Sequence, residues 1–259
     1  MTMKLWEASK DQKNKSNLFR YENFLNQRYK IRFNKNYSKL HNWSIKNPEK
    51  FWSSIWDFSN VKGKKIEKFY KSKELFKNQF FLNSRLNFAE NLLSKNDNSK
   101  AITFVSENGY KEIRKWNELN LNVGKISFYL KKINIKEKDR VAAYLPNLIE
   151  TVESFLATVS IGAIWSSCSP DFGVNGVIER FAQIKPKVLI LCDRYYYNGK
   201  EINVVDRLHL ILKKIKSIKN IIIINYPGKK NIKSKKNKNV NFEFWKNIKK
   251  LKPKKLEFK

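Results

Sequence analysis

Cysteine, histidine, glycine and proline are all scarce in this chain of 259 residues. Its two cysteines, Cys168 and Cys192, are too few for a disulfide-stapled secreted fold or a cysteine-based zinc module. Two histidines, His41 and His209, leave little material for a histidine-based metal site. Eight glycines and six prolines exclude collagen-like and glycine/proline-rich low-complexity chains. Hydrophobic residues make up 41% of the sequence, which is enough to build a core.

Long apolar segments are also missing. The first ten residues hold no apolar stretch of the length found in secretory signals. The most apolar stretch, residues 154–168, is short for a bilayer crossing and is interrupted by Ser and Thr. Together with two unpaired cysteines, these absences predict a protein of the reducing cytoplasm that has no membrane partner.

Acidic residues are few, with 23 Asp and Glu against 54 Lys and Arg, so the formal net charge is +31. Such a charge is typical of nucleic-acid-binding proteins, which stay open here as an alternative. However, residues 101–200 carry 14 basic and 10 acidic side chains, so the part that reads most like a globular core is nearly balanced. Only 9 of the basic residues are Arg, the residue that base readout and bidentate phosphate contacts favour. The composition therefore favours a solvated, lysine-rich surface without a specific nucleic-acid partner.

The chain falls into two parts with different patterns. Residues 1–97 are rich in aromatic side chains, and those of residues 51–58 lie close to helical spacing, which predicts a packed amphipathic helix. From residue 98 apolar strands alternate with helical patterns, and the clearest strands are 141–145, 188–192 and 221–224. This alternation predicts an α/β fold with a parallel sheet and helices on both faces. We expect a mainly helical N-terminal extension over residues 1–97 and the α/β domain over residues 98–259.

Two polar segments follow predicted strands, residues 165–173 and residues 193–200. Ligands of α/β sheets bind at the carboxyl ends of strands, and both segments are expected to lead towards helix N-termini, which favour anions. Lys200 beside Gly199 could hold a phosphate, although ordinary polar loops explain this spacing as well. Cys168 lies in the first segment, but neither histidine is placed to act as its base, so a buried structural thiol is the better interpretation.

Several phosphate-binding motifs are absent. The sequence contains no Walker lysine loop, no GxGxxG and no Ser/Thr/Gly-rich loop that ends in lysine. The residues by themselves therefore predict an α/β domain with a possible anion pocket and without a complete reaction centre.

Six segments share a pattern with one enzyme family: residues 51–58, 86–93, 139–150, 161–173, 177–181 and 186–193. They resemble the adenylate-forming acyl-CoA synthetases and, within them, the acetoacetate–CoA ligases. The run GAIWSSCSPDFG at residues 162–173 is typical of the acetoacetate-activating branch. The resemblance extends over nearly the whole chain.

The resemblance implies a two-step reaction, in which ATP and acetoacetate, or a similar short acid, form an acyl-adenylate and pyrophosphate, and CoA then displaces AMP. Mg²⁺ assists the first step. The family's ATP-phosphate loop and catalytic lysine have no match in these 259 residues. Residues 98–259 are therefore expected to form a partial AMP-binding domain that ends before that loop. ATP and Mg²⁺ belong to the complete enzyme, at most CoA to this chain, and the chain alone is expected to be inactive.

The resemblance also assigns residues on the CoA side, while no catalytic and no metal-binding residue is assigned. A family loop with two basic residues that meet CoA phosphates matches residues 193–200. Lys200 keeps one basic position, after the matching Gly199, and the other position falls at Tyr197, which has lost the charge. Phe172 matches an aromatic position of the family, and with Gly173 it is expected to line the same region. A non-catalytic protein that binds CoA or a partner chain remains the alternative.

Overall fold

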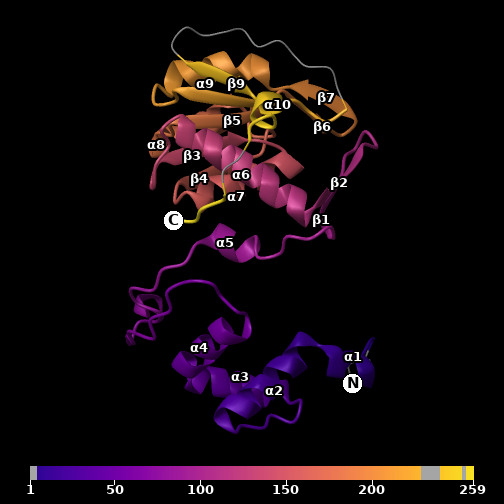
Figure 1. Cartoon of the computed structure of the whole chain (residues 1–259), viewed down its shortest axis with the longest axis vertical. Coiled ribbons are helices and arrows are strands. Elements are labelled where there is room, and N and C mark those ends of the chain that lie inside the picture. Colours follow the sequence, from indigo (N-terminus) through magenta and orange to yellow (C-terminus); the bar gives the residue numbers. More distant parts are fainter. Residues whose placement is uncertain (1–4, 229–239, 253–254) are drawn as a thin grey trace. The chain divides into compact units, whose positions relative to one another are not determined.

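The computed structural model describes residues 5–228, 240–252 and 255–259. The chain forms two compact units, residues 1–86 and residues 87–259, and each has its own elements and core (Figure 1). The domain boundary expected between residues 97 and 98 rests on the change of pattern in the sequence rather than on compactness, and it stays a prediction.

The first unit is helical up to Phe58 and largely irregular after it. Its elements are α1 (Lys10–Lys15), α2 (Asn17–Tyr29), α3 (Tyr37–Lys46), α4 (Pro48–Phe58) and the short 3₁₀ helix η1 (Leu75–Lys77). The predicted helix over residues 51–58 is confirmed by α4. Its Phe51, Ile55 and Phe58 pack against a small core built on Tyr21 and Leu25, so the aromatic row is mainly core material.

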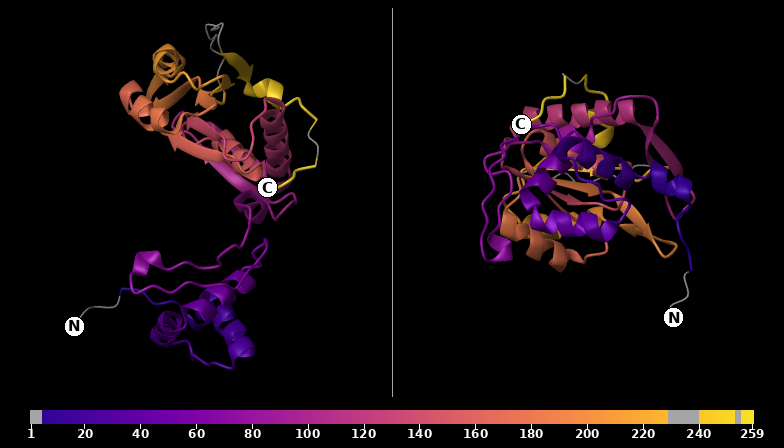
Figure 2. Two further views of the ribbon diagram at one scale, coloured as in Figure 1. Left: turned by 90° about the vertical axis from the view of Figure 1, so that its left-hand side faces the viewer. Right: turned by 90° about the horizontal axis from the view of Figure 1, so that it is seen from below.

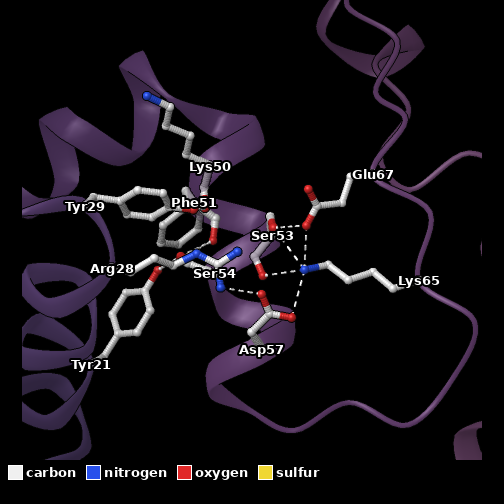
Figure 3. Close-up of polar contacts among 10 residues, drawn as sticks. All are labelled: Tyr21, Arg28, Tyr29, Lys50, Phe51, Ser53, Ser54, Asp57, Lys65 and Glu67. Carbon is white, nitrogen blue, oxygen red and sulfur yellow. Dashed lines mark hydrogen bonds and ion pairs between the residues drawn. The ribbon is translucent and has the colours of Figure 1, made fainter.

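A cluster of charged and hydroxyl groups fastens the irregular segment after α4 to that helix (Figure 3). The Nζ of Lys65 lies 2.8 Å from Asp57 Oδ1, 2.7 Å from Glu67 Oε1 and 2.9 Å from Ser53 Oγ. Burial opposes the charge of Lys65, but the hydrogen bonds that it donates to these two carboxylates raise its pKa. Lys65 is therefore a permanent cation that clamps the segment, and it cannot act as a base for Ser53.

The second unit is built on a five-stranded sheet, and all neighbouring strands in it are parallel. In spatial order the strands are β4 (Ile164–Cys168), β3 (Arg140–Tyr144), β5 (Val188–Cys192), β8 (Asn220–Ile224) and β9 (Asn241–Phe244). Before the sheet come α5 (Phe88–Leu92) and the antiparallel hairpin of β1 (Lys100–Val105) and β2 (Lys111–Lys115). The three strands predicted most clearly correspond to β3, β5 and β8.

Helices cover both faces of this sheet (Figure 2). One face packs against α6 (Trp116–Lys132), α7 (Ile149–Ser160) and α10 (Trp245–Ile248), and the other packs against α8 (Val174–Ile184) and α9 (Leu208–Lys214). Successive residues of β5 alternate between the two cores, as the pleat requires, and all are fully buried. The predicted α/β fold, a parallel sheet with helices on both faces, is confirmed.

Two details differ from the pattern in the sequence. The apolar spacing of residues 204–218 predicts one helix, but the structure has the 3₁₀ turn η2 (Val205–Arg207) followed by the short α9. Ile215 and Ile218 continue the apolar spacing and are buried, but they lie in the turn that leads to β8. The apolar spacing of these two residues therefore indicates that they are buried, although they lie in a turn and not in a helix. In addition, β9 and α10 were not predicted, because each has only four residues and carries a weak pattern.

A buried ionic cluster ties the β1–β2 hairpin to the helices on one face. Glu153 of α7 is completely buried, its Oε1 lies 2.9 Å from Arg114 Nε of β2, and it accepts a hydrogen bond of 2.7 Å from Asn122 of α6. Burial raises the pKa of Glu153 to about 7, and Arg114 and Asn122 only partly oppose that rise. Near neutral pH this carboxyl is therefore poised between its two protonation states.

We predict that Glu153 makes the protein less stable as the pH rises from about 4.5 to about 7. A carboxyl whose pKa rises on folding from 4.5 to about 7 takes up a proton in that interval, which favours the folded state only at the lower pH. At about 1.4 kcal/mol per pKa unit the effect reaches roughly 3 kcal/mol. Glu153→Gln removes this titration, so urea unfolding should show the variant gaining stability relative to the wild type between pH 5 and pH 8.

Glu137→Gln is the matched control, because Glu137 is exposed and the charge change is the same. If the wild type and Glu153→Gln lose stability in parallel between the two pH values, Glu153 does not take up a proton on folding.

Candidate functional site

The sheet reverses its direction of growth between β3 and β5. From β3 the chain moves to β4 on one side and then returns to β5 on the other side. The carboxyl ends of β3 and β5 therefore mark a topological switch point, where open α/β sheets bind their ligands. The residues that follow β3, β4 and β5 are the first candidates for a site.

The loop after β4, which contains Phe172 and Gly173, is held from beneath by a buried tyrosine. Tyr144 is the last residue of β3, and its hydroxyl lies 2.7 Å from the carbonyl of Phe172 and 3.0 Å from that of Pro170. Arg207 of η2 donates to the Tyr144 hydroxyl at 2.6 Å and to the Pro170 carbonyl at 2.8 Å. Burial raises the pKa of Tyr144, although Arg207 opposes this, so the hydroxyl keeps its proton and donates it to the loop.

Phe172 and Gly173 occupy the exposed part of that loop. The ring of Phe172 is 41% exposed, and the guanidinium of Arg180 lies over it at 4.1 Å from the centroid. Gly173 is the N-cap of α8, and a Cβ added at this glycine would meet no atom within 4 Å. Both residues can therefore be reached from outside.

Cys168 and Cys192 are free thiols, and both are buried. Burial raises the pKa of each thiol, so neither is a thiolate at neutral pH. This agrees with the interpretation of Cys168 as a structural residue.

The segment after β5 folds differently from the loop predicted there. It forms a hairpin of β6 (Arg194–Tyr197) and β7 (Lys200–Asn203), joined by Asn198 at φ 49° and Gly199 at φ 72°. Two central residues with positive φ are typical of the tight turn that Asn-Gly favours. Gly199 and Lys200 therefore lie at a hairpin tip and not near a helix N-terminus, which corrects the expectation for this segment. Tyr197 and Lys200 pair across the turn.

The base of this hairpin is fixed by Asp193, which is completely buried. Its carboxylate accepts hydrogen bonds from the backbone N–H of Tyr226 at 2.8 Å and from Asn225 Nδ2 at 3.1 Å. Next to it, Arg194 donates to Glu201 of β7 at 2.7 Å. The exit from β8 and the start of the hairpin are thereby held together.

The five residues assigned from the sequence thus form two groups. Tyr197, Gly199 and Lys200 gather at the hairpin tip, while Phe172 and Gly173 lie in the loop after β4. Tyr195, near the hairpin base, lies close to Asp171 of the loop and to Arg207.

Sequence reasoning missed Tyr144, Tyr195 and Arg207, which position the loop, and Glu107, whose carboxylate accepts the Gly199 N–H at 3.2 Å. The Asn-Gly pair at 198–199 was the only signal in the sequence that could have indicated the hairpin.

Two searches of the described residues gave negative results. Within residues 5–228, 240–252 and 255–259, no three His, Cys, Asp or Glu side chains are grouped so as to hold a metal ion. In the same ranges, every helix is too short or too polar to cross a bilayer.

Comparisons with known proteins agree with the resemblance seen in the sequence. The chain is 39% identical over 221 residues to an acetoacetyl-CoA synthetase of Xenopus tropicalis, covering 83% of this chain and 33% of that protein. It is 37% identical over 225 residues to the acetoacetyl-coenzyme A synthetase of Rhizobium meliloti (strain 1021), covering 86% of this chain and 34% of that protein. The chain thus spans about a third of the length of these relatives.

A solved structure has the same fold. The acetoacetyl-CoA synthetase of Streptomyces lividans superposes on the whole of this chain with a TM-score of 0.88, over 39% of its own chain and at 24% identity. The family model described as AMP-binding enzyme matches residues 93–256, which include the parallel sheet, the loop after β4 and the β6–β7 hairpin. With this match over more than half of its length, the chain belongs to the family of AMP-binding enzymes.

Proposed function

We propose that this chain is the N-terminal, CoA-contacting portion of an acetoacetate–CoA ligase, which converts acetoacetate, ATP and CoA into acetoacetyl-CoA, AMP and pyrophosphate. The activity named for the relatives supports the reaction. The observation that carries the CoA role is the exposed tip of the β6–β7 hairpin, where Lys200 follows Gly199, whose backbone N–H already binds an anion, the Glu107 carboxylate.

The hairpin tip has the chemistry to hold a phosphate. A Cβ added at Gly199 would meet no atom within 4 Å, so the tip has room for a phosphate oxygen to approach. Lys200 supplies a mobile point charge beside it, and an ammonium binds phosphate without the bidentate geometry of arginine. Tyr197 adds no charge. We therefore infer that the tip binds one phosphate group of CoA with modest strength.

The loop after β4 supplies the other part of the CoA side in this proposal. Phe172 exposes its ring there, and Arg207 and Tyr144 hold the loop backbone in one shape. An exposed aromatic ring on a fixed loop can pack against the apolar part of the pantetheine arm. The loop would thus orient the arm while the hairpin tip holds a phosphate.

ATP and Mg²⁺ belong to the complete enzyme in this proposal, where Mg²⁺ offsets phosphate charge. The 259 residues contain no Ser/Thr/Gly-rich loop that ends in lysine, so the residues present do not fit a triphosphate. We infer that the chain alone forms no acyl-adenylate. Two free, buried cysteines support a cytoplasmic location.

A chimera tests the reaction. Residues 1–259 joined to the remaining two thirds of the Rhizobium meliloti synthetase should form acetoacetyl-CoA from acetoacetate, ATP and CoA, measured by chromatography of the thioester product. Acetate is the control acid and should react more slowly. A folded chimera that prefers acetate, or that releases AMP with neither acid, contradicts the proposal.

Lys200→Ala tests the CoA contact in the chain itself. Removing one exposed ammonium from a phosphate should weaken CoA binding about threefold to tenfold, which titration calorimetry can measure at low salt. Lys213→Ala, on exposed α9 surface, is the control and should bind CoA like the wild type. Equal dissociation constants for Lys200→Ala and the wild type would remove Lys200 from the site.

Arg207→Ala tests how the loop after β4 is positioned. The variant leaves the Tyr144 hydroxyl and the Pro170 carbonyl without their donor, so amide hydrogen exchange of residues 169–176 should accelerate and CoA should bind several-fold more weakly. Arg207→Lys should partly restore both the slow amide exchange and the CoA affinity, because its ammonium can still donate a hydrogen bond. Unchanged exchange in Arg207→Ala would show that the loop holds its shape without this residue.

A further inference from the structure

Two hairpins meet at the carboxyl end of the sheet, and a buried tyrosine joins them. Tyr226 follows β8 and is only 5% exposed. Burial raises the pKa of its hydroxyl, nearby Ser106 in the β1–β2 turn opposes that rise, and its ring packs against Tyr196 of β6 at 5.1 Å between centroids. The β1–β2 turn is therefore held beside the β6–β7 hairpin by an element that belongs to neither.

This arrangement brings a carboxylate to the hairpin tip. Glu107 lies in the β1–β2 turn, and its Oε2 accepts the backbone N–H of Gly199 at 3.2 Å. The turn is fixed by its own hydrogen bonds, from Gly109 N–H to the Ser106 carbonyl at 3.0 Å and from Tyr110 N–H to Asn108 Oδ1 at 3.2 Å. The backbone that carries the Glu107 side chain is therefore ordered.

The carboxylate occupies the donor that a phosphate would use. The acceptor of the Gly199 N–H is an anion from another hairpin. A phosphate oxygen placed on the same N–H would lie within a few ångströms of the carboxylate, where two negative charges repel. The two anions thus exclude each other.

We propose that Glu107 is an internal competitor for phosphate at the Gly199 and Lys200 tip, which a ligand phosphate must displace in order to bind. The identity of that ligand as CoA rests on the proposed function. Displacement requires the phosphate to gain more from Lys200 and the Gly199 N–H than Glu107 gains from the N–H alone. A multiply charged phosphate, which interacts more strongly with Lys200 and the Gly199 N–H, therefore displaces Glu107 more readily than a weaker anion does.

Glu107→Gln tests this with a gain of binding, which damage to the fold cannot imitate. The amide has nearly the shape of the carboxylate but no charge, so CoA should bind about twofold to fivefold more tightly, the range expected for one exposed charge contact. Pantetheine, which has no phosphate, should bind both proteins equally. Glu137→Gln changes the net charge identically at an exposed turn before β3, at the amino end of the sheet, and should leave CoA binding unchanged.

A second readout does not depend on CoA. Selective ¹⁵N-glycine labelling gives amide signals from the eight glycines alone, and the Gly199 signal should shift in Glu107→Gln and respond to inorganic pyrophosphate at lower concentrations than in the wild type. Equal or weaker CoA binding in Glu107→Gln, while Lys200→Ala weakens it, overturns the competition and leaves the proposed function standing. If no variant binds CoA, the proposed function fails, and the pyrophosphate response of Gly199 still decides whether Glu107 competes.

Discussion

A fully buried carboxylate at the end of β5 determines where the chain goes next. A charge without solvent is costly unless donors surround it, and Asp193 finds them in the Tyr226 N–H, Asn225 and Arg194. These partners come from the exit of β8 and from the first residue of β6. Satisfying one carboxylate thus aligns the β6–β7 hairpin with the segment after β8 and places Tyr226 where it can reach the β1–β2 turn. The arrangement of the hairpin tip follows from this single requirement.

Four acidic residues of the second unit are used inside its core. Asp139, Glu150, Glu153 and Asp193 are all buried, and each lies close to a basic side chain. Burial of these acids does not change the formal net charge of +31, but it leaves fewer carboxylates on the surface to pair with the lysines there. The charge thus accompanies the fold and does not by itself define a polyanion-binding surface.

The elements that were predicted correctly are those whose signal is local. Strands β5 and β8 are continuous apolar runs because both of their faces are buried, and α4 shows its buried face in its spacing. The Asn-Gly pair at 108–109 comes soon after an apolar run and predicts the turn of the β1–β2 hairpin, whereas the same pair at 198–199 was assigned to a loop. The difference lies in context, since an α/β alternation makes a helix the expected element after a strand, and the hairpin is an insertion into that alternation.

The site could be predicted only in part for a related reason. Phe172, Gly173, Tyr197, Gly199 and Lys200 came from a family resemblance, which identifies positions but not the contacts that hold them. Those contacts join residues far apart in the chain: Arg207 and Tyr144 are 63 positions apart, and Glu107 and Gly199 are 92 apart. No periodicity or motif carries information over such separations. The order of the strands, which creates the switch point between β3 and β5, is non-local in the same sense.

The long separation between Glu107 and Gly199 has a consequence for biosynthesis. A ribosome releases the β1–β2 hairpin long before it releases Tyr226, the residue that joins this hairpin to the tip of β6–β7. Contacts that close large loops form late, because the entropy of closing them is lost before the contact is gained. The nascent chain therefore carries two independent hairpins for the time it takes to make β8. The contact between Glu107 and Gly199 is formed only when the chain that follows that strand has left the exit tunnel and packed between them.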